Sequence, residues 1–396
     1  MAFFRNNTVN LLNLHYGVHS LALSGGGAFF AVFLLQAGVP APGVLSALAA
    51  ILAGRFCVRP LVLVLAKRWG LKPLVIAGTV ITGLQYPLLA QVRGVGPDLF
   101  VLCVVSSLGD TLYWTCYHAY FAALGDSEHR GHQIGAREAM AAIVGIVGPL
   151  ITGWALTTLG PKIAFDATAA VLLLAALPIL ATPNVPIART APAALSQAWP
   201  SILMFAADGW AWSCYGLVWQ IALFLALGRS FTAFGGAMAL AAVAGAISGL
   251  LLGRWIDRGH GQKAVWLAIG SAALCVLMRA LGYGNPVLAV IANASGALVV
   301  AFVTPTVMSV VYNQSQRSAC TLRFAIATEA GWDVGGASGL LVAAGLLQAG
   351  APLGAAIALA LLGTAASFAL LRRHYRAPTP LSAAGEGLAR ILGREG

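Results

Sequence analysis

Charged residues are scarce in this chain. Asp, Glu, Lys and Arg make up 9% of its 396 residues, whereas hydrophobic residues make up 59% and the mean hydropathy is +0.85. A water-soluble globular protein carries roughly 25% charged residues, so water is not the solvent around most of this surface. The composition therefore predicts an integral membrane protein.

Segments in which polar and apolar residues alternate are missing too. In lipid, only helices and closed barrels satisfy their backbone hydrogen bonds, and barrel strands would alternate at every second residue. Here the apolar stretches continue for about 20 residues, the length of a helix that crosses a hydrocarbon core of roughly 30 Å. We therefore expect an all-α membrane protein.

Several chemical signatures are absent as well. The sequence has no nucleotide-binding glycine loop, no nucleophile elbow and no soluble domain for an ATPase, so we expect neither an enzyme nor a primary pump, and no cofactor. Its six cysteines are scattered without C-x-x-C spacing, which predicts packing residues and no disulfide framework. The net charge of +11 comes from short loops that form no basic face, so we expect no nucleic-acid partner.

Glycine, proline and charge clusters divide the chain into twelve predicted spans. The longest break contains four prolines and separates two halves of six spans. We expect an N-terminal six-helix bundle over 1–180, a cytoplasmic linker over 181–201, a C-terminal bundle over 202–371 and a cytoplasmic tail over 372–396. The predicted spans are 10–35, 43–65, 73–90, 98–122, 139–159, 163–180, 202–227, 233–255, 264–281, 286–311, 324–347 and 352–371.

Basic residues predict the orientation of these spans, because cytoplasmic loops carry an excess of Lys and Arg. With both termini inside, 17 of the 23 basic residues fall on the cytoplasmic side, 4 fall outside and 2 lie within a span. The 4 outer residues are Arg93, Lys162, Arg229 and Arg279, and the 2 within a span are Arg55 and Arg59. We therefore expect a multi-pass protein of the bacterial inner membrane with cytoplasmic termini.

The two halves repeat part of their sequence. Ala136-Arg137-Glu138-Ala139, followed by Gly145 and Gly148, aligns with Ala327-Thr328-Glu329-Ala330, followed by Gly336 and Gly339. Parallel six-helix repeats related by a pseudo-two-fold axis place a substrate site near the midplane, between the two bundles.

A loop between the eighth and ninth spans carries a signature. Gly253-Arg254-Trp255-Ile256-Asp257-Arg258-Gly259-His260-Gly261-Gln262-Lys263 resembles the loop motif of the major facilitator superfamily. The equivalent loop in the first half matches only in part, with Lys67 where that family usually has aspartate. The fifth span, from Gly145 to Gly153, is similar to the family's Gly-Pro motif associated with exporters, with Thr152 in place of one glycine. The resemblance implies a twelve-helix transporter that binds a small molecule or an ion.

The signature loop also has a physical rationale. A short glycine-rich turn lets two helix ends approach closely, so that its aspartate can meet the positive N-terminus of a neighbouring helix. The resemblance implies that Asp257 lies near the start of the fifth span, beside Arg137 and Glu138, and acts with Arg258 in gating. The alternative is that Asp257 and Arg258 form a solvated turn.

Ionisable residues inside the spans form two i, i+4 pairs. Arg55 and Arg59 share a face of the second span, and Glu329 and Asp333 share a face of the eleventh. The resemblance implies that these helices face each other. Measured from the predicted cytoplasmic ends, Arg59 and Glu329 lie about 9 and 8 Å deep, and Arg55 and Asp333 both about 14 Å. We predict an interdomain ladder, Arg59 with Glu329 and Arg55 with Asp333; the alternatives are a static bridge or a pair between Arg55 and Asp110.

Two spans carry an acid followed by aromatic residues at helical spacing. The resemblance implies that both line the central cavity, and an acid above aromatic rings suits stacking or cation–π contact with a ligand. The alternative is an interfacial aromatic belt. The two stripes are Asp110, Trp114, Tyr117 and Phe121 on the fourth span, and Asp208, Trp212, Tyr215 and Trp219 on the seventh.

Three histidines complete the predicted cavity. His15 and His19 lie one turn apart on the first span, and His118 lies on the fourth. Such a pair can bind a metal or relay protons, since histidine titrates near neutrality, but packing is the commonest role. The carboxylates within the spans are the other candidates for proton coupling.

The leading hypothesis is a monomeric secondary active transporter in which two bundles alternate around one site, driven by protons. The alternatives are a facilitator, a transporter of a metal or metal complex that uses His15, His19 and His118, and a membrane sensor that has kept the fold without transport. The Gly-Pro motif leans slightly towards export, and the substrate is not specified by the sequence.

Overall fold

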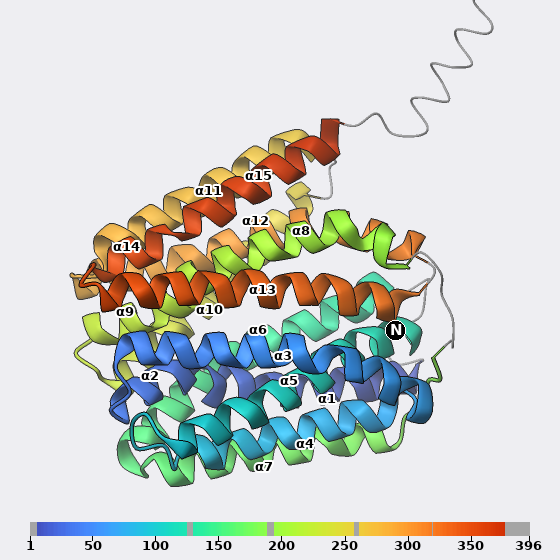
Figure 1. Cartoon of the computed structure of the whole chain (residues 1–396), viewed down its shortest axis with the longest axis horizontal. Coiled ribbons are helices and arrows are strands. Elements are labelled where there is room, and N and C mark those ends of the chain that lie inside the picture. Colours follow the sequence, from blue (N-terminus) through green and yellow to red (C-terminus); the bar gives the residue numbers. More distant parts are fainter. Residues whose placement is uncertain (1–5, 125–129, 188–193, 257–260, 319, 377–396) are drawn as a thin grey trace, which may run out of the picture.

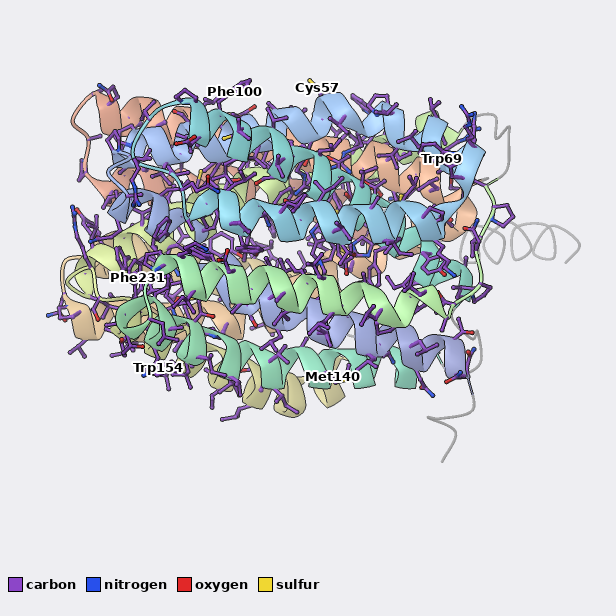
Figure 2. The ribbon with its side chains drawn as sticks, turned by 90° about the horizontal axis from the view of Figure 1, so that it is seen from below. Cys57, Trp69, Phe100, Met140, Trp154 and Phe231 are labelled. Carbon is purple, nitrogen blue, oxygen red and sulfur yellow. The ribbon has the colours of Figure 1, made fainter. Side chains whose placement is uncertain are left out.

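The computed structural model describes residues 6–124, 130–187, 194–256, 261–318 and 320–376. These residues form helices joined by short turns, and no strand occurs among them. The helices lie side by side, and their turns gather at two opposite ends of the molecule (Figure 1). Trp69 marks one end, where the N-terminus also lies, and Phe100 and Phe231 lie towards the other (Figure 2).

Twelve rods make up the described fold, and three of them are interrupted. The first rod is α1–η2–α2, the seventh is α8–η3–α9 and the twelfth is α14–α15. The N-terminal half contains α1 (Asn7–Ser24), η2 (Gly26–Phe29), α2 (Phe30–Gln36), α3 (Ala41–Trp69), α4 (Leu71–Leu89), α5 (Pro97–Leu124), α6 (Arg130–Thr158) and α7 (Pro161–Leu180). The C-terminal half contains α8 (Ala194–Trp212), η3 (Ser213–Leu217), α9 (Val218–Ala226), α10 (Phe231–Ile256), α11 (Gly261–Gly282), α12 (Pro286–Arg317), α13 (Thr321–Gln348), α14 (Leu353–Ala358) and α15 (Ala360–Arg376).

The twelve-helix fold predicted from the sequence is confirmed. Ten of the rods are long and apolar enough to cross a membrane on their own. The other two are α4, which includes Lys72 and Gln85, and α12, whose shorter apolar stretch runs over Pro286–Ala297. One predicted boundary is wrong: α8 begins at Ala194, inside the segment predicted as a linker, so the connection between the halves is shorter than expected.

Two pairs of helices join the halves. On one side α3 packs against α13, and on the other α6 packs against α10. These seams correspond under the repeat, because α3 and α10 are the second helices of their halves and α6 and α13 are the fifth. The twelve helices therefore form two six-helix bundles related by a pseudo-two-fold axis.

Glycines let α13 approach α8 closely within the C-terminal bundle. Gly331, Gly335 and Gly339 recur every four residues on one face of α13, and a β-carbon at Gly335 would collide with the Ala206 carbonyl oxygen. Small residues at this spacing are typical of helix contacts in membranes, where close packing replaces the hydrophobic effect between helices. The packing fixes the face of α13 that carries Asp333 towards the other bundle.

The outside of the bundle is apolar. Phe100 and Trp154 project from the helices (Figure 2), and both are largely exposed, as are Leu177 and Leu281. Large exposed apolar side chains at this density would be a liability in water, but they match a hydrocarbon solvent. The chain is a multi-pass membrane protein.

Candidate functional site

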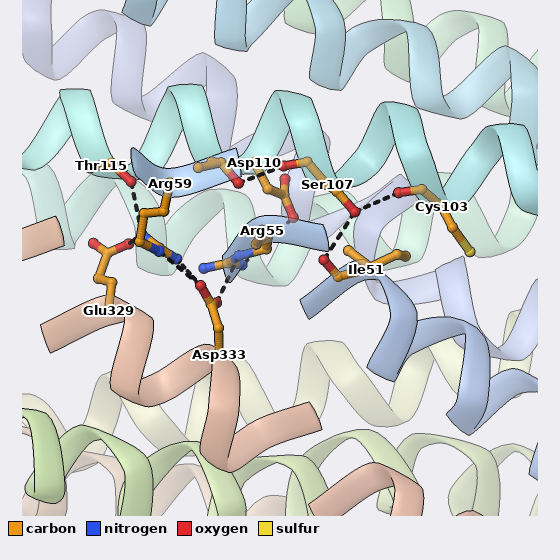
Figure 3. Close-up of polar contacts among 10 residues, drawn as sticks. Ile51, Arg55, Arg59, Cys103, Ser107, Asp110, Thr115, Glu329 and Asp333 are labelled. Carbon is orange, nitrogen blue, oxygen red and sulfur yellow. Dashed lines mark hydrogen bonds and ion pairs between the residues drawn. The ribbon is translucent and has the colours of Figure 1, made fainter. Parts of the chain in front are cut away.

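Two arginines of α3 contact two carboxylates of α13 across the seam between the bundles (Figure 3). Arg59 Nη1 lies 2.6 Å from Glu329 Oε2, and Arg59 Nε donates to Asp333 Oδ2 at 2.8 Å, with a further contact from Nη2 to the same oxygen. Arg55 Nε lies 3.0 Å from Asp333 Oδ1, as an ion pair without hydrogen-bond geometry. Both pairs predicted from the sequence are present, and Asp333 receives both arginines.

Helix geometry explains why these residues meet. Counted at 1.5 Å per residue, Arg59 lies about 15 Å from the Trp69 end of α3. By the same measure, Glu329 lies about 12 Å from the start of α13. The Arg59 and Asp333 side chains are 1% and 0% exposed, so the charges lie deep within the protein and depend on each other for compensation.

A third helix, α5, supports the network. Arg59 Nη1 also donates to Thr115 Oγ1 at 2.9 Å, and Arg55 Nη1 lies 3.8 Å from Asp110 Oδ2. The alternative partner considered for Arg55 is therefore present too, in addition to Asp333. Ser107 ties α5 to α3 by donating to the Ile51 carbonyl at 3.0 Å (Figure 3). We call Arg55, Arg59, Asp110, Glu329 and Asp333 the seam network.

A cavity of about 240 Å³ lies beside the seam network. It is enclosed by both halves of the chain, with α1–α5 on one side and α8–α9 and α13 on the other. Among the predicted cavity residues, Asp110, Trp114 and Trp212 line it. The polar lining residues are Arg55, Gln85, Tyr86, Ser106, Asp110 and Gln220, and Trp332 completes three tryptophan walls.

A π-helical turn breaks the stripe predicted on the seventh span. The turn η3 inserts one extra residue in the helix after Trp212, so the side chains beyond it are rotated relative to a regular helix. Trp212 faces the central cavity, but Asp208 and Tyr215 line a separate small cavity inside the C-terminal bundle. Their predicted place in the central cavity is wrong. For Tyr215 the reason is the π-turn, of which the sequence gives no sign, whereas Asp208 precedes the turn and faces the interior of its own bundle.

A buried arginine, Arg279, lies near that small cavity. Its side chain is 5% exposed, its Nη1 donates to the Tyr215 carbonyl oxygen at 2.6 Å, and its Nε donates to the Ala292 carbonyl at 3.3 Å. The guanidinium also lies 5.3 Å from the Tyr215 ring and 5.1 Å from the Trp219 ring. Counting Arg279 as an outer loop residue is therefore wrong. The sequence could have indicated this burial, since position 279 falls inside the predicted span 264–281.

The predicted histidine pair does not line the central cavity. His15 and His19 are fully buried between α1, α5 and α7. His15 uses both ring nitrogens, with Nδ1 at 2.6 Å from the Ala175 carbonyl and Nε2 at 3.0 Å from the Tyr113 hydroxyl. His19 stacks on Tyr113 with 3.8 Å between ring centroids. The structure thus places this pair in packing, the commonest role for such residues.

The other two predicted cavity residues of α5, Tyr117 and His118, are not among the residues that line the central cavity. Tyr117 is fully buried and stacks with Tyr113, so its predicted place in the cavity is wrong. His118 is exposed, and its ring stacks against Trp114 with 5.6 Å between the ring centroids. In the described part of the chain, no group of three His, Cys, Asp or Glu side chains is arranged to hold a metal ion.

Four predicted gating residues cannot be placed. The helix α6 contains Arg137 and Glu138, but their side chains lie outside the described residues, as do Asp257 and Arg258. The equivalent loop of the first half is described. There Lys72 Nζ donates to the Leu180 and Thr182 carbonyls at 2.7 and 2.8 Å, and Asn184 Nδ2 donates to the Trp69 carbonyl at 2.8 Å. Although this loop departs from the family motif, it fastens the start of α4 to the segment after α7.

Comparisons with known proteins agree with this architecture. The model of the Major Facilitator Superfamily matches residues 12–204. Among solved structures, the POT family transporter PepTSo is 12% identical with a TM-score of 0.69, and the alignment covers 94% of this chain and 99% of that one. An auto-inhibited POT family peptide transporter is 15% identical (TM-score 0.64; 94% and 98% covered), and a point mutant of the nucleoside transporter NupG is 13% identical (TM-score 0.66; 92% and 98% covered). A comparison with curated proteins gives no match.

Proposed function

The chain belongs to the major facilitator superfamily, and from this premise we propose that it is a proton-coupled secondary active transporter that moves a small solute by alternating access. The seam network carries the proposal. Its ion pairs cross from one bundle to the other beside a cavity that both bundles enclose. Rocking the bundles apart on this side breaks those pairs, so the network sets the free energy of the closed seam.

Proton coupling is proposed because carboxylates are part of the network. Glu329 and Asp333 are held by arginines in the closed seam. When the seam opens, they lose these partners, and an unpaired carboxylate inside the protein gains from binding a proton. Protonation and opening are therefore expected to occur together, which couples the conformational cycle to a proton gradient.

The proposed membrane and the orientation of the chain in it rest on the distribution of basic residues among the loops. After Arg279 is removed from the outer side, Arg93, Lys162 and Arg229 remain there against 17 basic residues on the other side. This excess supports an inner-membrane protein of bacterial type with cytoplasmic termini. One copy of the chain encloses the whole cavity, so we propose a monomer. The substrates named for the structural neighbours, peptides and nucleosides, are too different to indicate one for this chain.

Spin-label distances test alternation without a known substrate. One pair, at Trp69 and Trp266, reports on the Trp69 end of the two bundles, and a second pair, at Phe100 and Val287, reports on the opposite end. All four side chains are exposed, and the labels are introduced after the six native cysteines have been replaced. Alternating access predicts that one distance grows as the other shrinks when the pH of reconstituted vesicles is lowered. Distances that stay fixed in both pairs would contradict the proposal.

Transport itself is tested after a ligand has been found. A thermal-shift screen of the purified protein against metabolites, drugs and metal chelates identifies compounds that stabilise the fold. Counterflow of such a compound in proteoliposomes, with acidification of the lumen monitored by a trapped dye, then measures exchange and proton movement. Binding without counterflow would favour the sensor hypothesis.

A further inference from the structure

The charges of the seam network do not balance. Three carboxylates, Asp110, Glu329 and Asp333, face two guanidiniums, Arg55 and Arg59. Within the seam network, one negative charge therefore has no cationic partner of its own. An uncompensated charge at this depth in a membrane protein costs a few kcal/mol, so such a residue usually has a functional partner.

The geometry indicates which carboxylate is in excess. Asp333 contacts both arginines and is 0% exposed, and Glu329 lies 2.6 Å from Arg59. Among the described side chains, the one ion pair of Asp110 is the 3.8 Å contact with Arg55, which is already paired with Asp333. The Asp110 side chain is also the most exposed of the three, at 25%, and it is the one carboxylate among the residues that line the central cavity.

Tryptophans provide the rest of the binding surface. Trp114 follows Asp110 by one helical turn on α5, and Trp212 and Trp332 line the cavity from the other bundle. Cations bind to indole faces through the ring quadrupole, and the site already contains one example, Arg55 at 5.6 Å from the Trp332 ring. A carboxylate surrounded by indole rings is the environment that recognises quaternary and tertiary ammonium groups.

Two hydroxyls of the lining lack hydrogen-bond partners. Tyr86 Oη and Ser106 Oγ are buried, and neither makes a hydrogen bond with the described residues. Gln85 is a polar neighbour of Tyr86 but does not reach hydrogen-bond geometry. Buried polar groups are seldom left unsatisfied, so these oxygens are available to accept from a polar group on a ligand.

An anionic ligand fits these observations poorly. Arg55 is the one guanidinium or ammonium group among the lining residues that the structure describes, and it is already held by Asp333. An anion would also meet the excess charge of Asp110. The volume, about 240 Å³, lies below the usual range for drug-sized ligands and limits the ligand to a small molecule.

We infer that the central cavity binds a small organic cation, with Asp110 as its counter-ion and Trp114, Trp212 and Trp332 as its aromatic walls. This inference rests on the proposed transport function and names the substrate class for that site. The same carboxylate can be neutralised by a proton or by the cation, so the two ligands compete for Asp110. When a site that binds either the proton or the cation is exposed alternately to the two sides of the membrane, the proton is exchanged for the cation.

A pair of probes with one shape and different charge tests the inference. Phenyltrimethylammonium and tert-butylbenzene differ by a nitrogen in place of a carbon, and benzenesulfonate supplies the anion. Binding to the full chain in lipid nanodiscs is measured by calorimetry. We expect the ammonium probe to bind at least about tenfold more tightly than either of the others. Equal affinity for the cation and its neutral isostere, or tighter binding of the sulfonate, would overturn the inference.

Variants assign the preference to named side chains. Asp110→Asn should lose at least about tenfold in affinity for the ammonium probe, whereas Asp110→Glu should retain the preference for charge. Asp166→Asn is the matched control, since Asp166 is an exposed carboxylate of the same bundle paired with Lys162. Trp212→Leu should weaken binding, and Trp154→Leu, on the outer surface, should not. An unchanged affinity in Asp110→Asn, with a retained melting temperature, would contradict the assignment.

Competition with protons gives a separate readout. Asp110 is faced by Arg55 and Arg59 from α3, by Tyr86 from α4 and by Asp333 from α13. At acidic pH a proton on Asp110 removes its negative charge, so affinity for the ammonium probe should fall as the pH is lowered from 8 to 5. Affinity that is independent of pH would contradict competition. If the probes fail while the two spin-label pairs still move reciprocally, the substrate class is wrong and alternating access stands; if the labels do not move, the transport proposal fails.

Discussion

The two seams between the bundles are equivalent by topology and differ in chemistry. The α3–α13 seam holds buried arginines against carboxylates, whereas no ion pair joins α6 to α10 among the side chains that the structure describes. There, Gly235 lies against the Pro149 carbonyl and Gly153 against the Phe231 carbonyl. Ion pairs hold helices at one register and must break before the helices separate. Glycine faces pack closely without specific bonds and allow one helix to shift along the other. We therefore expect the ion pairs of the α3–α13 seam to hold the two bundles together until they break, and we call this seam the latch. We expect the α6–α10 seam to let its helices slide along each other, and we call it the bearing.

The largest expected effect comes from Arg59, which pairs with both acids of α13. Arg59→Met leaves Glu329 and Asp333 buried with less compensation, and the loss of one partner of a buried pair costs about 3 to 5 kcal/mol. We expect a lower melting temperature and a shift of the Trp69–Trp266 distances towards the open state. Adding Asp333→Asn removes one of the stranded charges and should restore part of the melting temperature. A double variant that melts no higher than the single one would show that the charges are not coupled.

Arg279 tests whether the loss of any buried arginine, and not only one in the α3–α13 seam, shifts the spin-label populations. Its contacts, with Tyr215, Trp219 and Ala292, all lie within the C-terminal bundle. Arg279→Met removes charge-assisted hydrogen bonds and should cost about 1.5 to 3 kcal/mol in stability. Because none of these described contacts crosses a seam, we expect the melting temperature to fall while the ratio of the two spin-label populations stays as in the unmodified chain. A shift in that ratio as large as that of Arg59→Met would remove the distinction between the seam and the bundle interior.

The bearing is tested at Gly235. A β-carbon there would collide with the Pro149 carbonyl oxygen, whereas one at the next residue, Gly236, would meet nothing within 4 Å. Gly235→Ala should therefore separate α6 from α10 and cost about 1 to 2 kcal/mol after the gain in helix propensity is included. Gly236→Ala is the matched control and should be neutral or slightly stabilising. Equal melting temperatures for the two variants would show that close packing is not required at this seam.

The sequence predicted the helices better than the faces that they present. The helices could be predicted because hydrophobic length sets a span. The ladder could be predicted because the family resemblance implies that the second and eleventh spans face each other, and the i, i+4 spacing and depth of their charges then match. The orientation of the stripe on the seventh span could not be predicted. A single π-turn after Trp212 rotates Tyr215 away from the cavity, and nothing in the amino-acid composition marks that turn. The predicted cavity position of the histidines is wrong for a related reason. His15 has its partners, Ala175 and Tyr113, on two other helices, and the periodicity of a single helix does not encode how helices pack together.

The smallest expected effect concerns a hydrogen bond across the α6–α10 seam. Thr157 Oγ1 lies 3.0 Å from Thr232 Oγ1 near the end of both helices, where the pair is exposed. Thr157→Val removes this bond, together with the one that Thr157 Oγ1 donates to the Gly153 carbonyl within α6, and keeps the shape of the side chain. Because the pair is exposed, stability should fall by no more than about 0.5 to 1.5 kcal/mol. If the seam acts as a bearing, it does not depend on specific bonds, and the spin-label populations should not change. A population shift comparable to that of Gly235→Ala would instead make Thr157 part of a second latch, and the two seams would then differ in strength and not in kind.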